Sequence, residues 1–222
     1  MFRNQPTISI ASSHLGYKIG SFDMFLYISS KLFIKFNTVA TAVQVNTNTL
    51  LDGIQLFDEN IEIGFTDSEI ILSDENAMLT IPTLLWEGQN FIGQWDPPQV
   101  ILHTIIQPSS LLKSIFLVPI QEGIVEMNIG KTLEFQVISK MGARITSSLS
   151  NLEKFRFQYP KEKLSLRYLY KTFFKLKYSL KKASKITLRL NEDGVQQWQM
   201  LLPIQEQNVY VEFFIEPLTS EL

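Results

Sequence analysis

The sequence predicts an α+β fold of two similar β-rich domains, each with short helices. Runs of alternating or clustered β-forming residues dominate the chain, and only a few segments have apolar residues at helical spacing. Residues 82–100 interrupt this pattern with three prolines, two glycines and two of the three tryptophans, and the same order of elements then starts again. The 222 residues, 45% of them hydrophobic, can fill two cores. We therefore expect domains at residues 1–81 and 101–222, joined by an exposed connector at 82–100.

The first domain is predicted to have one short helix, with strands before and after it in the sequence. From Asn46 to Asn60, polar N-cap candidates precede four apolar residues at helical spacing, which predicts an amphipathic helix. Acidic turns at residues 67–69 and 73–76 divide the following segment into three strands. The apolar residues of the helix are Leu50, Leu51, Ile54 and Phe57, and the strands are expected at residues 8–12, 31–36, 39–46 and within 61–82.

The second domain repeats this order and adds a second helix. The segment QPSS at residues 107–110 opens one helix, and a lysine-rich segment further along the chain forms the other. A β-hairpin with an acidic glycine turn closes the chain. The apolar side of the first helix consists of Leu111, Leu112, Ile115 and Phe116, and the strands are expected at residues 100–106, 123–130, 133–148 as one long strand, 153–160 and 163–170, with the closing hairpin at 185–203 and 208–218.

Positive charge is concentrated in one part of the chain. Residues 154–189 hold 12 of the 20 Lys and Arg but only one of the 22 acids, so this window carries +11 and the rest of the chain −13. A concentrated positive patch on an acidic body favours nucleic acid or an anionic membrane over an acidic small molecule. A solvated helix face without a ligand is the alternative that composition leaves open.

The segment KTFFKLKYSLKK, residues 171–182, is amphipathic when it is drawn as a helix at about 100° per residue. No carboxylate lies three or four residues from its lysines to pair with them. Lysine offers a flexible point charge, so such a row suits phosphates and is indifferent to base sequence. The apolar side consists of Leu169, Phe173, Leu176, Leu180 and Ala183, and the opposite side of Lys171, Lys175 and Lys182, flanked by Lys177 and Lys181.

The sequence predicts no catalytic residue, no metal site and no cofactor. The absence of cysteine removes thiolate ligands and Cys nucleophiles, and it fits a reducing compartment. His14, expected in a loop, and His103, expected in a strand, have no catalytic motif around them. No apolar run is long enough to span a membrane, and the first residues lack the layout of a secretory signal. Three acid pairs fall where turns are expected, namely Asp58-Glu59, Asp74-Glu75 and Glu192-Asp193.

Several of these segments resemble the PCNA-like sliding-clamp superfamily. The closing segment, residues 186–218, is similar to the C-terminal hairpin of that family, with its acidic glycine turn and final Y-V-E-F strand. Residues 28–57, 105–118 and 135–161 resemble the Rad-one-type subunit of the checkpoint clamp, the heterotrimeric nine-one-one ring. The resemblance covers nearly all of the chain, but the strand and helix with which a clamp subunit begins have no counterpart. We therefore expect either a truncated sequence or a reduced first domain.

The resemblance implies a DNA-clamp fold, in which helices on the inner face surround duplex DNA and sheets form the outer wall. It implies a non-catalytic subunit of a heterotrimeric ring in the nucleus, placed on DNA by a clamp loader and acting in the DNA-damage checkpoint and in repair. Its expected partners are two other clamp subunits, duplex DNA bound without regard to sequence, and repair and checkpoint proteins, with no membrane. The implied DNA-binding residues are Lys171, Lys175, Lys177, Lys181, Lys182 and Lys185.

The connector is the natural platform for client proteins under this resemblance. Its candidate anchors are Trp86, Phe91, Ile92 and Trp95. Packing of these side chains onto a sheet is the alternative, because tryptophans are usually largely buried.

Three other functions stay open at this point. A homotrimeric replication clamp, a processivity factor, would form a self-trimer, whereas a checkpoint subunit would await other chains. A 3′–5′ exonuclease, an activity ascribed to the family, would need several carboxylates converging on metal ions. A basic helix that binds a membrane surface would show large exposed apolar side chains opposite its lysines.

Overall fold

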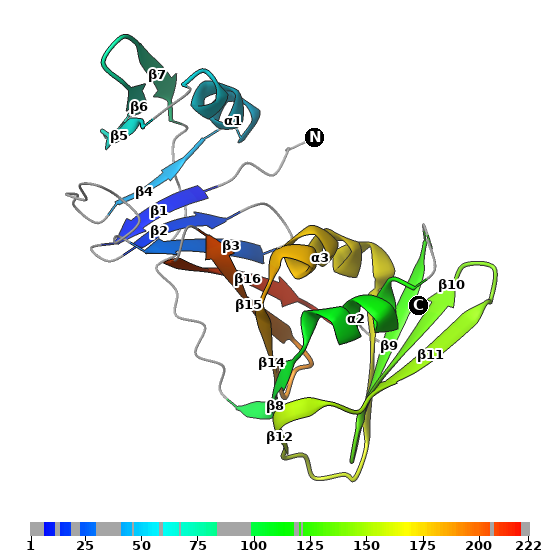
Figure 1. Ribbon diagram of the computed structural model, residues 1–222. Coiled ribbons are helices and arrows are strands. Elements are labelled where there is room, and N and C mark those ends of the chain that lie inside the picture. The colour runs from blue at the N-terminus through cyan, green and yellow to red at the C-terminus, as the bar shows by residue number, and fades with distance from the viewer. Residues whose placement is uncertain are drawn as a thin grey trace. The chain divides into compact units, whose positions relative to one another are not determined.

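Antiparallel strands make up most of the described chain in the computed structural model (Figure 1). The chain divides into two compact units, Met1–Gln94 and Trp95–Leu222. This division falls inside the segment predicted as a connector, but residues 84–98 are not among those described, so the extent of the connector stays a prediction. The structure describes residues 7–11, 14–18, 23–29, 41–45, 47–57, 60–66, 68–83, 99–117, 120, 122–204 and 207–218.

The first unit contains two antiparallel sheets and one helix in its described part. The strand order is β3-β2-β1-β4 in one sheet and β5-β6-β7 in the other. In the turn between β6 and β7, the Asp74 carboxylate accepts hydrogen bonds from the amides of Asn76 and Ala77, at 2.8 and 2.7 Å. The bounds are β1 (Thr7–Ala11), β2 (His14–Lys18), β3 (Asp23–Ser29), β4 (Thr41–Gln44), α1 (Thr47–Gln55), β5 (Glu62–Phe65), β6 (Glu69–Ser73) and β7 (Met78–Pro82).

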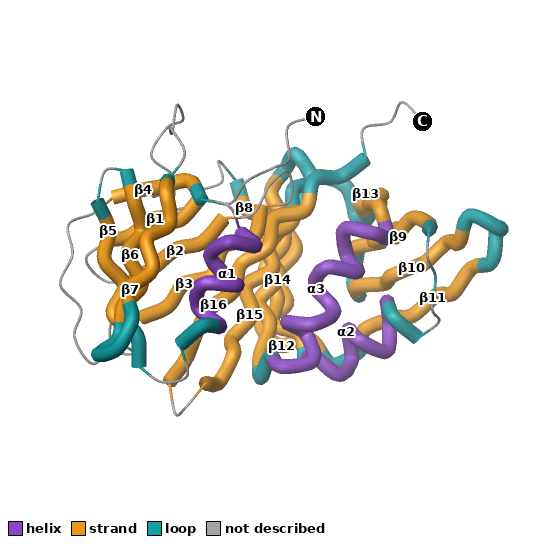
Figure 2. Tube along the Cα trace, turned by 90° about the horizontal axis from the view of Figure 1, so that it is seen from above, coloured by secondary structure: helices purple, strands orange, loops and turns teal. Residues whose placement is uncertain are grey.

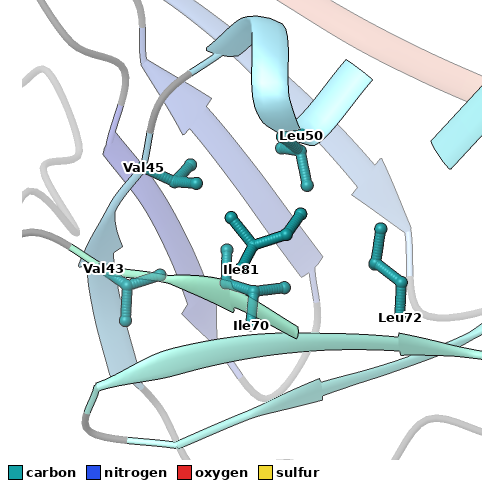
Figure 3. Packing of buried hydrophobic residues seen from close by; sticks show 6 residues of the cluster. All are labelled: Val43, Val45, Leu50, Ile70, Leu72 and Ile81. Atoms are coloured by element: carbon teal, nitrogen blue, oxygen red, sulfur yellow. The ribbon is translucent and has the colours of Figure 1, made fainter. Parts of the chain in front are cut away.

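Helix α1 packs on the smaller sheet through a glycine. A Cβ atom at Gly53 would lie 2.7 Å from Cδ2 of Leu79, so the helix backbone approaches the sheet closely at this point. Leu50 points into the core, as predicted, whereas Leu51 and Ile54 are 50% and 37% exposed and do not belong to the buried side. The core cluster in Figure 3 consists of Val43, Val45, Leu50, Ile70, Leu72 and Ile81.

The first unit also contains two strands that the sequence pattern does not predict, β2 and β3. His14 is the first residue of β2 and therefore does not lie in a loop. Gly16 interrupts the apolar alternation of this short strand, which hides it from a pattern based on periodicity. The predicted strand at 39–46 and the predicted helix at 46–60 are confirmed in shorter form, as β4 and α1. The predicted strand at 31–36 lies outside the described residues.

The second unit contains a five-stranded sheet, a four-stranded sheet and two helices. The strand orders are β12-β8-β14-β15-β16 and β11-β10-β9-β13, with all pairs antiparallel. Helices α2 and α3 lie side by side (Figure 2), and both contact the sheets of this unit. The bounds are β8 (Val100–Ile106), α2 (Pro108–Ile115), β9 (Gly123–Ile129), β10 (Leu133–Ser139), β11 (Arg144–Leu149), β12 (Leu152–Phe157), β13 (Leu164–Leu169), α3 (Tyr170–Lys182), β14 (Lys185–Asn191), β15 (Gln196–Ile204) and β16 (Gln207–Ile215).

Residues 133–148, predicted as one long strand, form the hairpin of β10 and β11. Gly142 turns the chain with a φ of 83°, a conformation that glycine adopts without strain, and its amide donates to the carbonyl of Ser139 at 2.9 Å. Strand β10 pairs with β9 on one side and β11 on the other, so of these two strands only β11 lies at an edge of the sheet. Strand β10 therefore has no unpaired edge to offer to another chain.

An aromatic cluster joins α3 to both sheets of the second unit. Phe173 meets Trp198 of β15 edge-on, with ring centroids 6.0 Å apart, and contacts Phe135 and Tyr168 at 6.4 and 5.9 Å. All four side chains are fully buried. The indole N–H of Trp198 donates to Oε1 of Gln196 at 2.7 Å, so its polar atom is satisfied. Burial of these rings stabilises the helix on both sheets.

The acidic turn between β14 and β15 is fixed to β13 by a buried hydrogen bond. Gly194 has a φ of 82°, and its carbonyl accepts a hydrogen bond from the hydroxyl of Tyr168 at 2.8 Å. Burial raises the pKa of Tyr168, so its hydroxyl stays protonated and can donate. The pair Glu192-Asp193 lies in this turn, as predicted.

Phe173 and its neighbour Phe174 provide a matched test of which face of α3 supports the fold. Phe173 is fully buried, whereas Phe174 is 53% exposed. We expect Phe173→Ala to lower the free energy of unfolding by about 3–5 kcal/mol, because it leaves a cavity against Trp198. Phe174→Ala should lower it by about 0.5–1 kcal/mol. Urea denaturation of both variants measures the difference, and equal losses would contradict the packing described here.

Candidate nucleic-acid interface

The lysine-rich segment forms α3, in close agreement with the predicted helix. Leu169 precedes it in an extended conformation (φ −70°, ψ 126°) and provides no side-chain cap. The last turn carries Lys181 and Lys182, whose charges interact favourably with the negative end of the helix dipole. Ala183 is extended again and leads into β14, so the helix ends where the lysine run ends.

The buried side chains of α3 lie opposite the exposed lysines Lys171, Lys175 and Lys182. The buried face consists of Tyr170, Phe173, Leu176 and Leu180. Leu169 was also predicted there, but it ends β13 and is 37% exposed. The six predicted lysines, which we call the lysine face, are Lys171, Lys175, Lys181 and Lys182, all exposed, Lys177, half-buried, and Lys185, exposed at the start of β14. At about 100° per residue, Lys171, Lys175 and Lys182 lie within about 40° of one another on α3, whereas Lys177 lies beside the buried residues and Lys185 lies outside the helix. The contact of these lysines with DNA stays a prediction.

Lys177 differs from the other lysines because two aromatic rings hold its ammonium group. Its Nζ lies 5.6 Å from the ring centroid of Phe116, just after α2, and 5.3 Å from that of Phe174. Cations are attracted to the faces of aromatic rings at such distances. The two rings also meet each other edge-on, with centroids 6.5 Å apart. Lys177 therefore contacts both rings as well as adding charge.

Repulsion between like charges acts within the lysine face. Although much of the Lys175 side chain is exposed, desolvation of its ammonium group by neighbouring atoms lowers its pKa, and the charge of Lys171 lowers it further. A bound anion would relieve this repulsion. The carboxylate of Glu122 is also influenced by Lys171, but its main partner is Lys140, whose Nζ lies 2.9 Å from Oε2 and lowers the pKa of Glu122. The lysine face therefore keeps a net positive charge.

The +11 window does not form one surface. Arg156, His103 and Arg189 stand opposite one another on three adjacent strands, β12, β8 and β14, so their side chains share one face of the sheet. Trp198, which contacts α3, lies on the other face, because its neighbour Gln197 is the residue paired with Arg189. A second basic surface therefore lies on the side of this sheet that faces away from α3.

A β-bulge creates this second row of positive charges. Between Glu153 and Arg156, two residues of β12 lie opposite Thr104 alone, and the first of them, Lys154, has a positive φ of 51°. In a regular ladder Phe155 would pair with His103. The bulge replaces this aromatic partner with Arg156. Such a placement cannot be predicted from charge counts alone.

The described acids and histidines show no catalytic arrangement. Among the described residues, no three His, Asp or Glu side chains are placed to hold a metal ion together. Asp74 and Glu192 lie in turns with their acidic neighbours, while Asp58-Glu59 is outside the described residues. His103 lies in β8, as predicted. No helix of the described chain is long and apolar enough to cross a membrane.

The predicted partner-binding residues lie outside the described residues. They are Trp86, Phe91, Ile92 and Trp95. Their role in binding other proteins stays a prediction.

Two aromatic residues of the exposed face were missed in the sequence. Phe174 and Tyr178 are 53% and 75% exposed and lie one helical turn apart among the lysines. Their spacing of four residues on the lysine side of the helix is the signal that could have identified them.

Two solved structures share this fold at low sequence identity. The PCNA2-PCNA3 complex from Sulfolobus tokodaii matches with a TM-score of 0.67 and 15% identity, over 97% of this chain and 91% of that chain. Proliferating cellular nuclear antigen from Entamoeba histolytica matches with a TM-score of 0.70 and 12% identity, over 97% of this chain and 90% of that chain. The chain therefore has the PCNA-like clamp fold, which confirms the predicted fold class.

Comparison of sequences adds no further relative. The chain matches no protein-family profile, and it matches no curated protein.

The pKa of His103 provides a test of the second basic row. Burial lowers this pKa below its usual 6.5, and the charges of Arg189, Arg156 and Lys154 lower it further. Because the neutral form is favoured only in the folded state, His103 contributes stability above pH 6.5 that is lost as the pH falls through its lowered pKa. We expect Arg156→Gln to raise the pKa of His103 in an NMR titration, and Lys161→Gln, as control, to leave it unchanged. An unchanged pKa in Arg156→Gln would contradict the row.

Proposed function

We propose that this chain is a non-catalytic subunit of a ring-shaped clamp that encircles duplex DNA. The observation that carries this proposal is the lysine face of α3, seated by a fully buried aromatic cluster on a PCNA-like clamp fold. A rigid row of lysines can follow a phosphate backbone without reading bases. The residues outside 154–189 carry a net charge of −13, which disfavours DNA contact there.

The open edge of strand β11 supports assembly into a ring. The other edge of its sheet, β13, is covered in part by the C-terminal segment, since the amide of Leu218 donates to the carbonyl of Arg167 at 2.7 Å. The edge strand β12 of the five-stranded sheet is bulged and carries exposed charges, which discourages pairing with another chain. Strand β11 has neither proline nor lysine, and its residues are mostly polar and exposed or half-exposed. Among the described edges of the second unit, β11 is therefore the one best suited to a neighbouring subunit.

We further propose that the ring is the heterotrimeric checkpoint clamp. The sequence resemblance of residues 28–57, 105–118 and 135–161 to the Rad-one-type subunit supports this assignment. Two other clamp subunits, a clamp loader, and repair and checkpoint proteins are then its partners, in the nucleus. The connector would bind the client proteins.

A homotrimeric replication clamp is the second candidate, favoured by the likeness to proliferating cellular nuclear antigen from Entamoeba histolytica. The mass of the purified protein separates the two. A self-trimer identifies the replication clamp, whereas a monomer that assembles only with other subunits identifies the checkpoint clamp.

The salt dependence of duplex binding tests the proposed function. In the variant with Lys171→Ala, Lys181→Ala and Lys182→Ala, the slope of log K against log salt should decrease by about 2.7, from about 0.9 for each phosphate that is no longer neutralised. Linear DNA with free ends is required, because a closed ring could otherwise be retained by topology. Alanine favours helix, so circular dichroism should show an intact fold.

A matched control removes the same charge from the same unit. Lys131, Lys161 and Lys163 are exposed and lie outside α3. Changing these three to alanine should leave the slope unaltered. If both triple variants reduce the slope equally, the contribution is one of net charge and the lysine face is not the DNA-binding surface.

Hydrogen exchange tests the proposed edge. The amides of β11 that do not bond to β10 should exchange more slowly once the ring has assembled, because a neighbouring strand then accepts their hydrogen bonds. The amides of β10 are already paired on both sides and serve as the internal control. Equal exchange in β11 before and after assembly would rule out this interface.

A further inference from the structure

Two exposed aromatic rings lie within the lysine face. Phe174 and Tyr178 are 53% and 75% exposed, and no other residues of α3 expose large aromatic side chains. At about 100° per residue, their directions differ by about 40°, and Tyr178 lies within about 40° of Lys171 and Lys182. Rings and ammonium groups therefore alternate on one surface.

The fold does not account for these two rings. The buried side of α3 already holds Phe173, Leu176 and Leu180, so the helix is seated without them. Phe174 touches Phe116 and the ammonium of Lys177, which hold it in place but leave half of its surface in contact with solvent. The role we propose for the lysines is contact with duplex phosphates, and such contact does not require aromatic rings.

We propose that the lysine face also binds single-stranded nucleic acid, with Phe174 and Tyr178 as platforms on which unpaired bases stack. The inference rests on the proposed DNA-binding role of α3 and specifies a second form of its ligand. Positively charged surfaces with interleaved aromatic rings are the usual means of binding single strands, because every base has a face that can stack. Lysines alone would bind duplex and single-stranded nucleic acid through charge, without any contact to the bases.

The geometry suits two bases of one strand. The rings are one helical turn apart, about 5.4–6 Å along the axis, which is within the span of neighbouring nucleotides in an unstacked strand. Lys171, Lys181 and Lys182 are exposed around Tyr178 and can reach the phosphates that connect such bases. A strand leaving a duplex inside the clamp would then meet charge and stacking surfaces on the same helix.

Fluorescence anisotropy with a labelled oligothymidylate measures this binding on the whole chain. We expect Phe174→Leu and Tyr178→Leu each to weaken single-strand binding by about 5-fold to 150-fold, the range for loss of one stacked base. Leucine keeps the apolar character but removes the ring. Tyr178→Phe keeps the ring and should bind as well as the unaltered chain. Tyr210→Leu, at a tyrosine of β16 that is 41% exposed, is the control outside α3.

Measurement of duplex binding on the same variants separates this inference from the proposed function. Loss of single-strand affinity with an unchanged duplex slope supports the stacking role. Unchanged single-strand affinity in both leucine variants would overturn the stacking role. The proposed function is tested separately, by the effect of the triple lysine variant on the salt dependence of duplex binding. A loss of flotation with anionic vesicles in the leucine variants, without any loss of single-strand affinity, would overturn the stacking role in favour of a membrane surface.

Discussion

The contact between Phe173 and Trp198 determines which face of α3 is exposed to solvent. It fixes α3 on the sheet and also its rotation about its own axis, since Phe173 is held between Trp198, Phe135 and Tyr168. Because successive residues of a helix are about 100° apart, fixing one side chain fixes the direction of all the others. The lysines face outward as a consequence of this packing, and a rotated helix would bury charge at a large cost.

Sequence pattern predicts a structural feature correctly where a single helical or strand periodicity continues through the whole segment. The lysine face was predicted because its charges and apolar residues repeat at helical spacing within one segment. The hairpin of β10 and β11 was not predicted. Residues that favour strands continue through most of this segment, and the turn forms because Gly142 adopts a positive φ. Leu51 was wrongly placed in the core because Gly53, which has no side chain, lets α1 approach the sheet from another side.

Other features depend on contacts between distant segments and cannot be predicted from local pattern. Arg156 and Arg189 are far apart in the chain, and only the pairing of β12, β8 and β14 brings both beside His103. The charge window therefore supplies two surfaces on opposite sides of one sheet. The exposed rings of α3 were missed for a different reason, since the same residue type, Phe, fills the core at position 173 and lies on the surface at position 174.

The bulge in β12 also affects which changes in chain length the second unit can tolerate. Strand β12 has one more residue than its partner between Glu153 and Arg156, and Lys154 adopts a left-handed backbone conformation to accommodate it. Deleting one residue here would restore a regular ladder and leave the pairing on both sides unchanged. A deletion in the middle of β14 would instead invert every side chain beyond it. Relatives of this chain that differ in length by a single codon within a strand should therefore differ at this position.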